Sequence, residues 1–246
     1  MENANAQTGK NFSATKISSE TAKTLRPVDV LIGIAVLGSI WGFVEVVLGG
    51  ALQSTGFSQR AGLLTGLGMG IMGVALGAFR RSVMLLGIAV VAILCKELVV
   101  PILHVSILCK ANSVLAVGLD GVALAGVAGI VGRRIARGYT VQIVAVACAA
   151  LLARSAFYFM GMKLAPCAHL LSFNKESGYA AFMAYNALGW AAFSALFFPL
   201  GHWLGVRLRE PILVLGTRRA PLYYAVSALA VALCWVVSGF AISAGF

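Results

Sequence analysis

Long apolar segments constrain this chain more than any other feature of its sequence. Seven of them recur along the 246 residues, each close to the roughly 20 residues that a helix needs to cross a bilayer. Lipid offers no hydrogen bonds to the backbone, so such segments fold as helices. Only 11% of the residues are charged, against about a quarter in soluble domains. We therefore predict an all-α, polytopic transmembrane helical bundle with spans at 29–51, 61–79, 82–104, 113–132, 139–162, 178–206 and 222–244.

The first 28 residues differ from the rest because they are polar and have no apolar period. We interpret them as a disordered cytoplasmic tail that precedes a transmembrane helical domain over residues 29–246. The first apolar segment begins too late, and is too long, for a cleaved signal peptide, so we expect it to remain as an anchor.

Lysine and arginine are distributed unevenly between the two sides of the predicted bundle. Thirteen lie in the tail and the second, fourth and sixth loops: Lys10, Lys16, Lys23, Arg26, Arg80, Arg81, Arg133, Arg134, Arg137, Arg207, Arg209, Arg218 and Arg219. The opposite loops have four: Arg60, Lys110, Lys163 and Lys175. The positive-inside rule therefore predicts a multi-pass protein of a cell inner membrane, with a cytoplasmic N-terminus and its C-terminus outside. The same bias accounts for the net charge of +11, so we expect lipid and not nucleic acid as the partner.

Five ionisable residues lie deep inside predicted spans: Glu45, Lys96, Glu97, Asp120 and Arg154. A charge at bilayer depth costs several kcal/mol on most scales, so it normally faces the bundle interior and finds a partner. At about 1.5 Å of rise per residue, the predicted topology places all five in the outer half of the membrane, together with Asn186. Five helices thus deliver polar groups to one layer.

Two interpretations of this layer remain open. The residues can form ion pairs that fix helix packing, or they can line an outward-facing pocket for a small polar molecule. Glu45 needs a cation at its own depth, and Lys96 and Arg154 are the candidates. Glu97 lies about 100° around the helix from Lys96, and we expect Lys96 to point inward. Aromatic residues near the same layer would either stack on a planar ligand or serve packing and an interfacial belt: Trp41, Phe157, Tyr158, Tyr185 and Trp190.

Small residues form stripes on several spans, which suits close helix contact. The second span carries Gly62, Gly66 and Gly70 at four-residue spacing, and Gly73 and Gly77 have the same spacing. Packing within the bundle and docking of a partner subunit both fit such stripes.

Cys109 and Cys167 fall in or beside outside loops, near His104 and His169. A disulfide, a metal site and no role at all remain open for them. Recognised metal, nucleotide and nucleophile motifs are absent from the sequence, so we expect no enzyme activity, no cofactor and no resident metal.

The quoted segments "SIWGFVEVVLGG", "LLTGLGMGIMGVALGAF", "VVAILCKELVVP" and "NSVLAVGLDGVALAG" resemble the substrate-binding (S) components of energy-coupling factor transporters. The resemblance covers residues 35–130. It rests on Trp41, Gly42, Glu45, Leu48 and Gly49, on Lys96 with Pro101, and on Asp120 with Gly121. Asp120 stands where the family pattern has glutamate. S components usually have six spans, so the seventh would be an addition to that core.

The resemblance implies a subunit that binds a vitamin-like molecule or a metal from outside. It also implies a transmembrane coupling protein and two ATPases as partners. The stripe formed by Ala35, Gly38, Ser39 and Gly42 would be the docking face for the coupling protein.

Three functions therefore compete. A transport subunit predicts an outward cavity lined by the substrate-binding candidates, which are Glu45, Lys96, Asp120, Arg154, Asn186 and Trp41. A non-catalytic membrane scaffold or assembly subunit predicts that the same residues pair off without a cavity. The third function is an intramembrane enzyme, for which no nucleophile–base pair or metal motif is visible in the sequence. A stand-alone carrier is a variant of the first function and would titrate Glu45 or Asp120, although no internal repeat is visible in the sequence.

Overall fold

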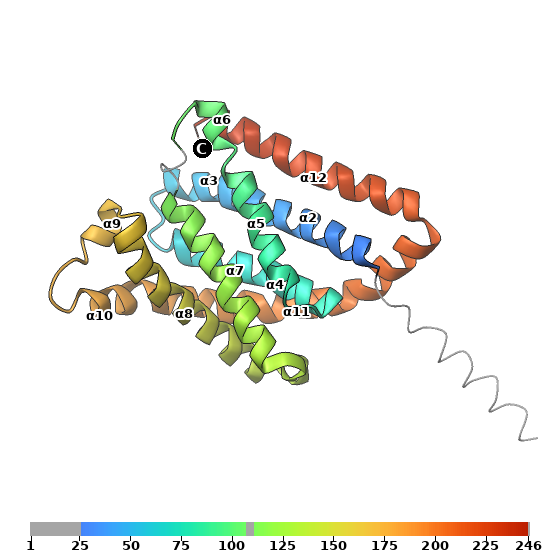
Figure 1. The fold of residues 1–246 in the computed structure, drawn as a ribbon, viewed down its shortest axis with the longest axis horizontal. Helices are drawn as coiled ribbons and strands as arrows, with labels where there is room; N and C mark the ends of the chain where they lie inside the picture. The colour runs from blue at the N-terminus through green and yellow to red at the C-terminus, as the bar shows by residue number, and fades with distance from the viewer. Residues whose placement is uncertain (1–25, 107–110, 246) are drawn as a thin grey trace, which may run out of the picture.

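The fold is an α-helical bundle, seen in a computed structural model that describes residues 26–106 and 111–245 (Figure 1). No β-strand occurs in these two stretches. Seven helical spans are long and apolar enough to cross a membrane: Pro27–Ser54, Arg60–Phe79, Met84–Leu103, Ala111–Val131, Tyr139–Leu164, Gly178–Arg218 and Ala220–Ser243. The prediction of an all-α, seven-span membrane bundle is confirmed.

Three of the spans are not uniform α-helices. The first comprises α2 (Pro27–Phe43), a π-helical turn η1 (Val44–Leu48) and α3 (Gly49–Ser54). The third is divided into α5 (Met84–Lys96) and α6 (Val99–Leu103). The sixth comprises α10 (Gly178–Phe182), the π-helical turn η4 (Met183–Ala187) and α11 (Leu188–Arg218).

The remaining spans are single helices, and short helical segments link some of them. The second, fourth, fifth and seventh spans are α4 (Arg60–Phe79), α7 (Ala111–Val131), α8 (Tyr139–Leu164) and α12 (Ala220–Ser243). A 3₁₀ segment, η3 (Gly132–Arg137), joins α7 to α8, and α9 (Ala168–Leu171) follows α8. The sixth span runs twelve residues beyond its predicted end at 206, through Pro199 and Pro211.

Glycines allow α4 and α11 to pack closely along most of their length. A Cβ added at Gly66 would lie 2.6 Å from the Cβ of Phe193 and 2.8 Å from its carbonyl carbon. Gly73 and Gly77 face the backbone oxygens of Phe198 and His202 in the same way. The stripe on the second span therefore serves packing inside this bundle, which is one of the two uses expected for it.

The small residues of α2 are also covered within the chain. Gly38 and Gly42 face α5, where a Cβ would meet Val91 and Cys95 respectively. Ser39 is fully buried, and its hydroxyl accepts a hydrogen bond from Trp235 Nε1 of α12 at 2.9 Å. Of the four residues of this stripe, Ala35 alone lines a groove, an apolar one between α2 and α12.

Helix α12 lies on the outside of the bundle beside α2 and reaches the end of the molecule where α6 lies (Figure 1). Its outer side chains, such as Leu229, Leu233, Val236 and Phe240, are exposed and apolar. A water-facing helix would not present such a surface, so the membrane contacts this face.

Candidate functional site

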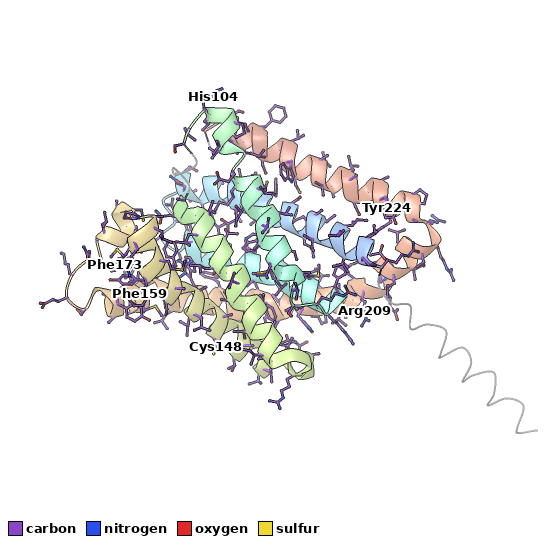
Figure 2. The ribbon with its side chains drawn as sticks, viewed as in Figure 1. His104, Cys148, Phe159, Phe173, Arg209 and Tyr224 are labelled. Atoms are coloured by element: carbon purple, nitrogen blue, oxygen red, sulfur yellow. The ribbon has the colours of Figure 1, made fainter. Side chains whose placement is uncertain are left out.

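A cavity of about 520 Å³, lined by polar and apolar residues, lies at one end of the bundle, among η1, α3, α4, α5, α7, α8, η4 and α11. Its rim carries exposed polar residues: Gln53, Ser58, Arg60 and His169. These lie where the first and second spans meet and on α9. Arg209, on the C-terminal part of α11, lies toward the other end of the molecule from Phe173, which follows α9 (Figure 2).

Five of the six predicted substrate-binding residues line this cavity: Glu45, Lys96, Asp120, Arg154 and Asn186. They come from five different spans. Trp41, the sixth, is fully buried and lies behind the wall. Among the other aromatic candidates, Phe157 and Trp190 line the cavity, whereas Tyr185 is exposed and Tyr158 packs in an aromatic cluster with Tyr179 and Phe182.

Glu45 is held by Lys96, one of the two cations that the sequence offered. Lys96 Nζ lies 2.7 Å from Glu45 Oε2 and also donates a hydrogen bond to Ser113 Oγ. The other carboxylate oxygen, Glu45 Oε1, accepts a hydrogen bond from Trp41 Nε1 at 3.3 Å. Trp41 therefore positions the carboxylate from behind. Among the described residues this is the one ion pair within 4.0 Å.

Lys96 points inward, as expected, and Glu97 does not line the cavity. Both carboxylate oxygens of Glu97 are buried, and neither has a hydrogen-bond partner in the described part of the chain. Helix α5 ends at Lys96, and α6 begins three residues later.

Asp120 and Arg154 are both about 2% exposed, and neither forms an ion pair with any residue of 26–106 or 111–245. Asp120 Oδ2 accepts a hydrogen bond from Thr65 Oγ1 at 3.3 Å, and Oδ1 has no described partner. The Arg154 guanidinium packs against the Trp190 ring, and its central carbon lies 4.6 Å from the centre of the Phe157 ring. Arg154 Nε and Nη2 have no hydrogen-bond partner among the described residues.

Both π-helical turns carry a residue of the site. Glu45 lies in η1 and Asn186 in η4. A π-turn inserts an extra residue into the helical repeat, which re-aims the side chains that follow, and such turns are frequent at functional sites. Asn186 Nδ2 donates to the Phe182 carbonyl at 3.3 Å, which leaves its amide oxygen for other partners.

Besides the rim residues, sequence reasoning missed three polar residues of the cavity: Thr65, Asn112 and Ser113. Each is an uncharged polar residue in or at the start of an apolar span, a weaker signal than a charge because a lone hydroxyl can bond to its own helix.

Only part of the set considered for a disulfide or metal site, which is Cys109, Cys167, His104 and His169, lies within the described residues. Cys109 lies outside the described residues, and Cys167 is a free thiol. Within residues 26–106 and 111–245, no group of three or more His, Cys, Asp or Glu side chains is positioned to hold a metal ion.

Known proteins offer no direct guide to this site. No family model, no curated protein and no solved structure matches the chain. The function must therefore be inferred from the chemistry of the cavity.

Proposed function

We propose that this chain is an integral membrane transport subunit that binds a small polar molecule from outside in the cavity around Glu45, Lys96, Asp120, Arg154 and Asn186. The molecule is organic and vitamin-like in size. A cavity of about 520 Å³ falls in the range of small-molecule sites, roughly 300–1,000 Å³.

The observation that carries this proposal is the convergence of charges from five spans on one cavity. Burying an ionised side chain in a membrane costs several kcal/mol on most scales, so a purely structural role would require its charge to be neutralised by a partner. Among the described residues, only Glu45 and Lys96 pair directly. Asp120 and Arg154 both line the cavity, and both are buried without an ion-pair partner in that part of the chain.

Partner subunits follow from the resemblance to S components of energy-coupling factor transporters. In that arrangement, a separate transmembrane coupling protein and two ATPases supply the energy, consistent with the absence of a nucleotide motif from this sequence. The chain would lie in a cell inner membrane with its N-terminus in the cytoplasm. Docking through Gly38, Ser39 and Gly42 would require α5 and α12 to move, because both now cover that face.

Native mass spectrometry of gently purified protein tests this function. The wild-type protein should retain a small molecule, and Glu45→Ala and Lys96→Ala should lose it, because each variant leaves the other member of the pair as an uncompensated charge in the cavity. Glu210→Ala and Lys163→Ala serve as controls, because these residues have the same charges but are exposed and lie outside the cavity. A wild-type protein that retains nothing, with both cavity variants merely less stable, would favour the scaffold.

A stand-alone carrier is the second candidate, and the irregular helices favour it. Glu45, Lys96 and Asn186 lie at two π-turns and a helix interruption, and carriers often build their sites from broken helices. Purified protein in liposomes, without other subunits, should accumulate the released molecule if the chain is a carrier. A subunit of a larger transporter should bind the molecule without moving it.

A further inference from the structure

The charges of the cavity divide into a neutralised pair and two unpaired groups. Glu45 and Lys96 satisfy one another at 2.7 Å, and Ser113 and Trp41 add hydrogen bonds to them. Asp120 and Arg154 attract each other electrostatically but lie beyond ion-pair distance. A ligand that bridges them can therefore meet both charges at once.

The side chain of Arg154 is positioned to bind an anion. Its guanidinium is planar, and Trp190 and Phe157 contact it as cation–π partners. Hydrogen bonds from a guanidinium lie in its plane and form a fork that matches a carboxylate or phosphate. No described residue accepts a hydrogen bond from Nε or Nη2, although the side chain is 98% buried and borders the cavity.

The other charges of the cavity favour a carboxylate over a phosphate as the ligand group that binds Arg154. Arg154 is the one unpaired cation in the buried part of the described cavity, since Lys96 is engaged by Glu45 and Arg60 lies on the exposed rim. A phosphate ester carries about −1.5 to −2 charges at neutral pH and would face Asp120 with too little compensation. A carboxylate carries a single negative charge, which one guanidinium can neutralise.

Asp120 and the aromatic walls define the rest of the ligand. Asp120 Oδ1 has no described donor, so it can accept a hydrogen bond from an N–H group. Phe157, Phe182 and Trp190 line the cavity and suit a ring or another flat apolar body.

We propose that the ligand is a small organic acid with a flat apolar body. Its carboxylate binds Arg154, and an N–H group donates to Asp120. This inference rests on the proposed function and narrows its substrate to one chemical class.

A metabolite extract of the expressing cells provides the test. The extract is used untreated, after mild methyl esterification of its carboxyl groups, and after phosphatase treatment. Wild-type protein freed of bound molecules is incubated with each, and retained compounds are identified by mass spectrometry. The expected compound is retained from the untreated and phosphatase-treated extracts and is lost after esterification.

Variants separate the role of Arg154 from general stability. Arg154→Gln should retain the compound about ten- to a hundredfold less well, since it loses charge-assisted hydrogen bonds. Arg154→Lys should lie between Arg154→Gln and wild type because it keeps the charge without the fork. Arg207→Gln is the matched control, because Arg207 also lies over a tryptophan, Trp203, at 3.9 Å, but outside the cavity.

Three results would overturn the inference alone: retention that survives esterification, retention lost with phosphatase, or normal retention by folded Arg154→Gln. If Arg154→Gln does not fold, the inference is still tested by which compounds the wild-type protein retains from the three extracts. No retained compound from any extract would overturn the proposed function together with the inference.

Discussion

At the scale of single residues, the site combines one satisfied ion pair with two charges that lack an ion-pair partner in the described part of the chain. The Lys96–Glu45 pair has side chains about 10% and 9% exposed, so little water screens it. Removing one partner of a buried pair leaves an uncompensated charge, whereas removing both does not. The pair can therefore be tested by a double-mutant cycle.

We predict that Lys96→Met lowers the stability of the protein by about 3–5 kcal/mol, because Glu45 then remains buried without its cation. The double variant Glu45→Gln/Lys96→Met should recover most of that loss. Thermal unfolding in mild detergent measures both. A Lys96→Met protein as stable as wild type would show that the pair is not needed to compensate Glu45.

At the scale of elements, the closest helix packing joins α4 to α11, and glycines on both sides make it possible. Gly201 and Gly205 of α11 face the backbone of Gly70 and Val74 of α4, so the contact is reciprocal. Because α4 carries Thr65 and α11 carries Trp190, this packing also fixes one wall of the cavity.

We predict that Gly66→Ala destabilises the protein by about 1–3 kcal/mol, since its Cβ would overlap Phe193 and the two helices would have to separate. Gly126→Ala is the control. Gly126 also lies within a span, on α7, but a Cβ there meets nothing within 4 Å. Melting temperatures of the two variants should differ clearly, and equal values would contradict the packing account.

At the scale of the whole molecule, the structure has seven candidate membrane spans, and five of them contribute the side chains of Glu45, Lys96, Asp120, Arg154 and Asn186 to one cavity. The spans could be predicted from sequence, because hydropathy is a local property, and five of the six candidate binding residues do line one cavity. The π-turns at Glu45 and Asn186 could not, since nothing in "VEVVL" or "MAYNA" encodes an extra residue per turn. Nor could the choice of Lys96 over Arg154 as the partner of Glu45, which depends on how the helices rotate in the packed bundle.

The central claim is that the cavity is open to the outside, and thiol accessibility in intact cells tests it most directly. The five native cysteines are replaced by alanine, and single cysteines are introduced by Asn186→Cys in the cavity, Ser58→Cys on the rim and Glu210→Cys on α11, past the predicted inner end of the sixth span. A membrane-impermeant thiol reagent should label the first two, and should label Glu210→Cys only after lysis. An unreactive Asn186→Cys beside a reactive Ser58→Cys would mean that the cavity is closed. External labelling of Glu210→Cys would mean that the orientation is reversed.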